Sequence, residues 1–184
     1  FADIEARIVG LPKAQDRDDA FAAFVEGFLA TQSMAQAEAI WPAGTVPAEL
    51  RRALKLPRTG VHGVYRTRQG AHVAYRTHFE PDRMAFSGRA LSALFGKTEA
   101  DDRRALFTNC ARVPAAARRR WTFHAVRATD FERLDRTDIA RIANWLGSGG
   151  VASVATGPRP HQFEALRAIG SGLRDADRAT VVMP

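Results

Sequence analysis

Three histidines stand in residues 60–79, GVHGVYRTRQGAHVAYRTHF, at His62, His72 and His78. Imidazole nitrogens are ordinary zinc ligands, so a zinc site built from these side chains is conceivable. His62 and His72 belong to different predicted strands, however, and their register is not fixed by the sequence. The single cysteine, Cys110, stands far from them along the chain. We therefore expect surface or half-buried histidines rather than a zinc site.

Arginine carries almost all of the positive charge. The formal net charge is +7, and the only lysines are Lys13, Lys55 and Lys97. The planar guanidinium fork suits phosphate groups, which favours a polyanion such as DNA as a partner. An Ala- and Arg-rich proteome, in which Arg replaces Lys on the surface, explains the same composition equally well. The arginines on or beside the central stretch are the candidate DNA contacts: Arg66, Arg68, Arg76, Arg83, Arg118, Arg119 and Arg120.

Residues 60–79 read as two β-strands joined by a tight turn at residues 68–71. Gly70 can adopt positive φ without steric cost, as hairpin turns of this kind require. Side chains alternate between the two faces of a strand. On the second strand, one face carries Val73, Tyr75, Thr77 and Phe79, and the other carries His72, Ala74, Arg76 and His78.

Helices are predicted before this hairpin, and no sustained period is evident in residues 1–18. Asp18 or Asp19 can cap an amphipathic helix whose apolar residues recur at helical spacing. Residues 35–41 continue as a short helix that Pro42 ends. Residues 48–56 form another, with Arg51, Arg52 and Lys55 on one side. The apolar face of the long helix consists of Phe21, Phe24, Val25, Phe28 and Leu29.

After the hairpin we expect a helix over residues 88–96, capped by Ser87, and an exposed charged segment over 97–104. Strands follow over 105–113 and 121–128. Cys110 is expected to be a buried free thiol. A last helix, capped by Thr137, ends at the glycine-rich run that begins at Gly147. The sequence thus predicts an α/β fold, with a central mixed sheet flanked by helices and the hairpin in its middle.

This order of helices and strands, together with the local sequence motifs, resembles the Mrr-like branch of the PD-(D/E)xK restriction-endonuclease fold. That family carries a metal-binding Asp in a Gly-Ile/Val-Asp setting on one strand, and Gln or Glu, one spacer and a catalytic Lys on the next. Gly60-Val61-His62 stands at the first motif and Tyr75-Arg76-Thr77 at the second. All three chemical positions, His62, Tyr75 and Thr77, therefore depart from the family pattern.

The resemblance also assigns a role to Glu26, because a Glu on the first helix often adds to the metal site of this family. With the other ligands replaced, a solvated Glu on a helix face is the favoured reading, and Glu26 is at most a relic. Nucleases of this type need clustered carboxylates for Mg²⁺. Glu80 and Asp82, in the loop after the hairpin, are the acids that could form a relocated site. We expect no catalytic residue and no metal site here.

A glycine-rich linker over residues 148–157 separates a second segment, residues 158–184, from the predicted domain, residues 1–147. RPHQFEALRAIGSGLRDADRATVVMP resembles the beginning of the superfamily 2 helicase motor. By this likeness Gln162 corresponds to the residue that reads adenine. The Gly-rich phosphate loop of that family would follow Pro184, so Gln162 would serve only in a longer parent protein.

Composition narrows the remaining classes of protein to which this chain could belong. The 184 residues, 46% of them apolar, can bury a core. No apolar run approaches the ~20 residues of a membrane span. The lone cysteine suits a reducing cytoplasm, where we expect the protein to act. Because the chain begins with Phe1, we expect it to be a piece of a longer protein.

The two resemblances together imply an N-terminal accessory DNA-binding domain of a helicase-like protein, with a nuclease fold that does not cleave. Its partners would be DNA and its own motor, with no membrane involved. The fragment would need no cofactor, and the parent would use ATP and Mg²⁺ as a DNA-dependent ATPase or helicase. Two alternatives stay open: an active endonuclease with relocated metal ligands, and a protein–protein interaction module.

Overall fold

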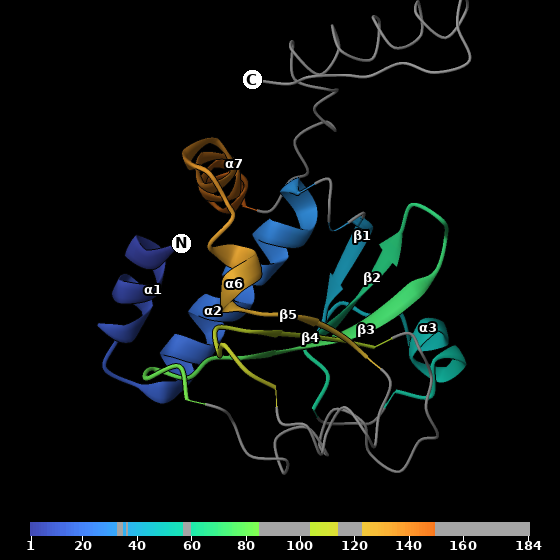
Figure 1. The fold of residues 1–184 in the computed structure, drawn as a ribbon. Helices are drawn as coiled ribbons and strands as arrows, with labels where there is room; N and C mark the ends of the chain where they lie inside the picture. The colour runs from blue at the N-terminus through green and yellow to red at the C-terminus, as the bar shows by residue number, and fades with distance from the viewer. Residues whose placement is uncertain (33–34, 36, 57–59, 85–103, 114–122, 150–184) are drawn as a thin grey trace, which may run out of the picture. The chain divides into compact units, whose positions relative to one another are not determined.

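The computed structural model describes residues 1–149 except 33–34, 36, 57–59, 85–103 and 114–122 (Figure 1). A five-stranded mixed sheet, ordered β1-β2-β3-β4-β5, forms its centre. Strands β1 to β3 pair antiparallel, whereas β4 runs parallel to β3 and β5 parallel to β4. The predicted α/β fold with a mixed sheet is confirmed. The strands are β1 (Ala37–Pro42), β2 (Gly63–Thr67), β3 (His72–His78), β4 (Arg104–Thr108) and β5 (His124–Val126).

The predicted hairpin consists of β2 and β3, and β3 is the middle strand of the sheet. Gly70 has a φ of +81°, the left-handed conformation for which glycine is suited. The turn closes through Thr67, whose backbone N–H donates to the Ala71 carbonyl at 2.8 Å. The predicted alternation is also confirmed, because Tyr75 and Phe79 enter one buried cluster while Ala74 enters another.

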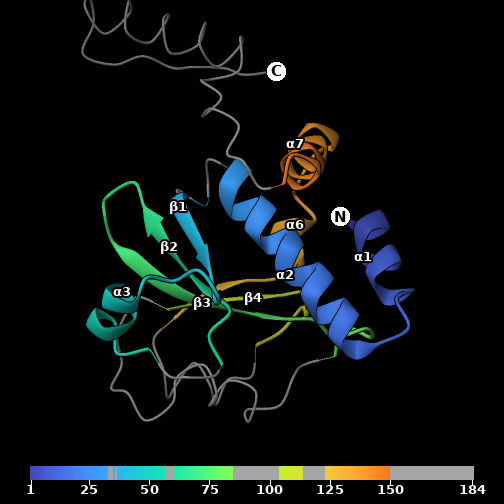
Figure 2. The ribbon, with the colours of Figure 1, turned by 180° about the vertical axis from the view of Figure 1, so that it is seen from behind.

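The long helix α2 (Ala14–Thr31) packs its apolar side against one face of the sheet (Figure 2). It begins earlier than the sequence suggested. Lys13 occupies the N-cap position, so the assignment of Asp18 or Asp19 as the cap is wrong. A further helix, α1 (Ala2–Val9), lies where no periodicity was recognised. About two turns provide too few apolar positions for a helical period to stand out.

Residues 35–41 are not the short helix that we expected. Residues 37–42 form β1, which pairs antiparallel with β2, so that Ile40 lies opposite Tyr65 and Trp41 opposite Val64. Ala, Gln and Glu favour helices, but propensity is a weak prior that tertiary context overrides. Here the backbone of this segment pairs with the free side of the hairpin and thereby satisfies its hydrogen bonds.

The remaining helices are α3 (Ala48–Ala53), α6 (Ala128–Phe131) and α7 (Arg136–Gly147). Asp135, rather than Thr137, caps α7, because its side chain accepts a hydrogen bond from the Asp138 backbone N–H at 2.8 Å. The predicted end of this helix at Gly147 is confirmed. Arg104 was expected in an exposed segment but is only 4% exposed, at the start of the buried strand β4.

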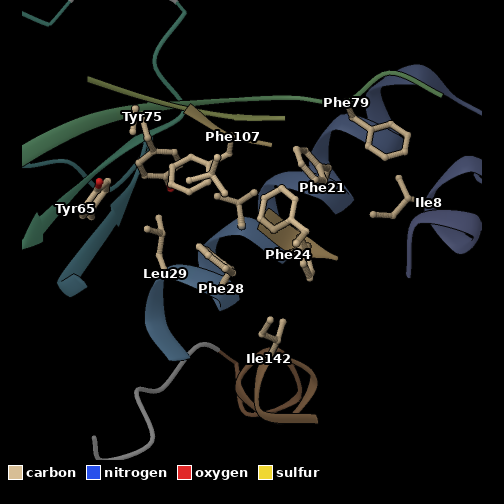
Figure 3. Close-up of a cluster of buried hydrophobic side chains, with 14 residues drawn as sticks. Ile8, Phe21, Phe24, Phe28, Leu29, Tyr65, Tyr75, Phe79, Phe107 and Ile142 are labelled. Atoms are coloured by element: carbon tan, nitrogen blue, oxygen red, sulfur yellow. The ribbon is translucent and has the colours of Figure 1, made fainter. Parts of the chain in front are cut away.

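Two apolar clusters hold the sheet. The larger lies between the sheet and α2 (Figure 3). In it, Phe131 of α6 meets the rings of Phe24 and Phe28 edge-on at centroid distances of 5.3 Å. The smaller consists of Val61, Ala74, Leu106, Cys110 and Val113. Leu106 alternates with Phe107 along β4, and Ala74 alternates with Tyr75 along β3. The smaller cluster therefore lies on the opposite face of the sheet. Cys110 is the buried free thiol that we expected.

Several expected features lie outside the described residues: the helix at 88–96, the arginines 118–120, most of the linker 148–157, and residues 158–184 with Gln162. Among the helices that are described, none combines the length and the apolar character that crossing a membrane requires.

Candidate functional site

The three positions assigned by the nuclease resemblance meet at the centre of the sheet. His62 immediately precedes β2, and Tyr75 and Thr77 lie on β3. The His62 backbone N–H donates to the Tyr75 carbonyl at 2.9 Å, which extends the hairpin ladder by one bond. The hairpin therefore brings these residues together although 15 positions separate His62 from Thr77.

His62 is bonded to Thr77 rather than open to a ligand. Its Nδ1 lies 2.6 Å from Thr77 Oγ1, and the Thr77 backbone N–H also donates to it at 3.4 Å. A nitrogen that accepts a backbone N–H carries no proton, so the ring is the neutral tautomer protonated at Nε2. Burial lowers the pKa of His62, and the charge of Arg76 lowers it further. Because imidazole is either neutral or positively charged, this position supplies no carboxylate oxygen for Mg²⁺.

Tyr75 fills the second position with a buried ring. It is fully buried, and a Cβ added at Gly63 would lie 2.5 Å from two of its ring carbons and from its hydroxyl oxygen. Glycine is therefore required opposite Tyr75 in β2. The hydroxyl donates to Glu26 Oε1 at 3.4 Å, a long hydrogen bond. Burial, and then the charge of Glu26, raises the pKa of Tyr75, which remains a neutral phenol.

Glu26 comes from α2 and is half-buried. Burial raises the pKa of Glu26, and the single bond from Tyr75 opposes that rise only in part. The nuclease resemblance named Glu26 as a possible addition to a metal site, and we expected instead a solvated Glu on a helix face. The structure instead turns the carboxylate towards the sheet and against the residue at the Gln/Glu position of the family motif. The expectation that Glu26 is solvated is therefore wrong.

Further charged groups surround the hairpin end. Asp18, on α2, has a pKa raised by burial, while the charges of His78 and Arg76 oppose the rise. Burial lowers the pKa of His78, whose Nε2 lies 3.7 Å from Glu80 Oε2. Sequence reasoning missed Asp18 because it placed this residue at the start of the helix. The helix begins at Ala14 instead, so Asp18 lies within it, where its charge interacts with those of His78 and Arg76.

The histidines do not form the conceivable zinc site. His72 and His78 stand at opposite ends of β3, about 20 Å apart at a rise of roughly 3.3 Å per residue. The His72 ring lies instead beside Trp41, at a centroid distance of 5.8 Å. Across the described ranges, no three His, Cys, Asp or Glu side chains gather closely enough to hold a metal ion.

The acids of the loop after β3 serve local roles. Asp82 Oδ1 accepts from the Met84 backbone N–H at 3.1 Å. The Glu80 backbone is held by Asn109, which accepts from its N–H and donates to its carbonyl, both at 2.8 Å. Only the Glu80 carboxylate faces the hairpin, through His78.

The four described candidate arginines differ in what already binds them. Arg83 is held by Glu5 and Glu132, and Arg66 Nε lies 3.0 Å from Glu38. Arg76 is half-buried and donates to the Gly60 carbonyl at 3.4 Å, and its enclosed Nε has no hydrogen-bond partner among the residues that the structure describes. Arg68 is exposed on the hairpin turn. A phosphate would thus meet least competition at Arg68.

Comparisons with protein-family models, with curated proteins and with solved structures find no match for this chain. Its function must therefore be argued from its own residues.

Proposed function

We propose that this chain is a DNA-binding domain with a nuclease-like frame that does not cleave, an accessory to a helicase-like motor. One observation carries the proposal. The three residues at the nuclease motif positions lie together on the central hairpin, and each is engaged with the protein rather than with an open site. The frame is compatible with the nuclease resemblance, while the side chains supply structural bonds in place of metal ligands.

The sheet supports the same proposal. An antiparallel hairpin forms its centre, a parallel strand follows, and a helix covers the face that carries Tyr75. The resemblance assigns its metal and catalytic positions to the two strands of such a hairpin. Glu26 on that covering helix meets Tyr75, as the family's helix Glu would meet its strand motif.

Duplex DNA is the partner that the charge favours. The chain carries a net charge of +7, almost wholly as arginine. Phosphate contacts position a protein on DNA without reading its sequence. Binding should therefore be weak, salt-dependent and nearly indifferent to base sequence. In the longer parent protein, the motor that residues 158–184 would begin would supply ATP and Mg²⁺ chemistry.

A salt titration of the full chain on two unrelated duplexes tests this proposal. If about four phosphates are neutralised, log K should fall against log salt with a slope of roughly −3 to −4. Arg68→Gln should weaken both duplexes equally and reduce the slope by about 1. Arg136→Gln, at the exposed start of α7, is the matched control and should change neither. Absence of binding at low salt would favour the interaction module.

Cleavage is tested separately with supercoiled plasmid and Mg²⁺ or Mn²⁺. We expect none. Cleavage that disappears in Glu26→Gln, Glu80→Gln or Asp82→Asn would favour an endonuclease with relocated ligands instead. Cleavage that survives all three changes would indicate a contaminant, and repetition with protein from a different purification would remove it.

A further inference from the structure

A cavity of about 360 Å³ lies away from the hairpin site, between the end of α2, the sheet, and the segment from β5 to α7. None of the residues discussed above for nuclease chemistry lines it. Ligand pockets in proteins typically start at about 300 Å³ and combine apolar walls with a few polar groups. This cavity has both features.

Aromatic and aliphatic side chains form the walls. Phe28 and Leu29 of α2 meet Phe107 of β4, and these side chains are 8%, 1% and 1% exposed. The Phe28 and Phe107 rings stand edge-to-face, 6.2 Å apart. Figure 3 shows Leu29 and Tyr65 at the end of the cluster near the hairpin. Such walls favour a flat apolar group.

Tyr65 adds a polar group to these walls. It is only 7% exposed, and its hydroxyl has no hydrogen-bond partner among the described residues. The hydroxyl oxygen is not fully enclosed, so it borders accessible space. Burial raises the pKa of Tyr65 to about 12, which keeps the phenol neutral and able to donate. A donor on the cavity wall that has no partner among the described residues favours a ligand that carries an acceptor.

The lining of the cavity also includes charged side chains. The Asp130 carboxylate accepts from the Arg127 backbone N–H at 2.9 Å and lies 3.9 Å from Arg133. The Asp138 carboxylate likewise accepts from the Asp135 backbone N–H at 3.2 Å and lies 3.6 Å from Arg141. The Arg127 guanidinium, by contrast, has no ion-pair partner within the described part of the chain. An anionic group at the mouth of the cavity would complement it.

We infer that this cavity binds a small aromatic carboxylate, whose ring lies against the Phe28, Leu29 and Phe107 walls and whose acid group reaches Tyr65 and Arg127. The site is independent of DNA binding. It offers the protein an effector site at the junction of α2 with the β5–α7 segment.

The probe for this site is 1-naphthoate, titrated by calorimetry into the full chain, with uncharged 1-naphthalenemethanol as its partner probe. We expect saturable one-to-one binding of naphthoate at low-millimolar concentration or below, and weaker binding of the alcohol. Arg127→Gln should weaken naphthoate about tenfold and leave the alcohol unchanged, since a charged hydrogen bond is lost. Absence of saturable binding would overturn the inference.

Two further variants locate the ligand. Tyr65→Phe should weaken naphthoate about threefold to tenfold, the loss of one hydrogen bond, whereas Tyr75→Phe, the matched control outside the cavity, should not. Leu134→Trp should fill the cavity and abolish binding. Equal affinities in Tyr65→Phe and Tyr75→Phe, or full binding in a folded Leu134→Trp, would contradict the assignment. Because the Phe variants remove one oxygen only, they remain informative if Leu134→Trp misfolds.

Discussion

Two glutamates on the helical side of the sheet, Glu5 on α1 and Glu26 on α2, show opposite electrostatic behaviour. Glu5 accepts from Arg83 Nε at 2.8 Å and from Asn109 Nδ2 at 2.9 Å, and its second oxygen binds Arg83 as well. Glu26 has one long bond, at 3.4 Å, from Tyr75. The first carboxylate is well supplied with donors and the second is not.

The pKa values follow from this difference. Burial alone would raise the pKa of Glu5, but the hydrogen bonds from Arg83 and Asn109 outweigh it and the pKa is lowered. For Glu26, burial dominates and the pKa is raised. A fully bonded charge stabilises a fold, whereas an under-bonded one destabilises it. Groups of the second kind concentrate at functional sites, which agrees with our choice of the hairpin as the candidate site.

The largest expected effect comes from breaking the Glu5 network at Asn109. Asn109 is fully buried and bonds both Glu5 and the Glu80 backbone. Asn109→Leu removes one donor from Glu5 and leaves the Glu80 backbone N–H without its partner, so it should lower the free energy of unfolding by about 3 kcal/mol. Urea denaturation followed by circular dichroism measures it. Asn144→Leu, on the exposed side of α7, is the matched control, and equal losses in both variants would remove the structural role given to Asn109.

A smaller effect is expected from crowding the Tyr75 ring. Gly63→Ala places a methyl group 2.5 Å from that ring, which is fully buried and has little room to move. Overpacking of this kind destabilises by about 1–3 kcal/mol. The control is Gly44→Ala, whose added Cβ meets nothing within 4 Å. If thermal unfolding places both variants at the wild-type midpoint, the close approach of Tyr75 to β2 is wrong.

The smallest effects sharpen the comparison between the glutamates. The ordinary pKa of both is 4.5. A lowered folded pKa gives stability that is present above about pH 4.5 and is lost as the pH falls, so Glu5→Gln should destabilise at neutral pH. A raised folded pKa removes stability as the pH rises through it. Glu26→Gln, which still accepts from Tyr75, should therefore stabilise at neutral pH by up to about 1 kcal/mol.

Midpoints of thermal unfolding, measured between about pH 3 and pH 8, test both substitutions. The Glu26→Gln difference should shrink as the pH falls towards about 4.5, because the raised pKa makes this carboxyl neutral above that pH, whereas the Glu5→Gln difference should shrink only as the pH falls below about 4.5. The same sign for the two variants at neutral pH would contradict the contrast on which the candidate site rests.

Local sequence patterns determined much of the frame. The apolar spacing of α2 and the alternation in β3 specify which side chains are buried, because the periods of helix and strand are fixed by backbone geometry. Gly70 specified the turn, since few other residues adopt its φ. The positions of His62 and Thr77 in that hairpin were therefore predictable, whereas the register that brings their side chains together came from the folded structure.

Tertiary structure alone decided which distant groups meet. Residues 37–42 became a strand because the hairpin offered unpaired backbone groups, which local propensity cannot register. Tyr75 bonds Glu26 across 49 residues, and Asn109 bonds Glu5 across 104. Each of these glutamates stands in a helix with ordinary neighbours, and nothing local distinguishes them. Their opposite pKa shifts arise only from burial and from the donors that the folded chain brings to each, and these depend on contacts across the whole domain.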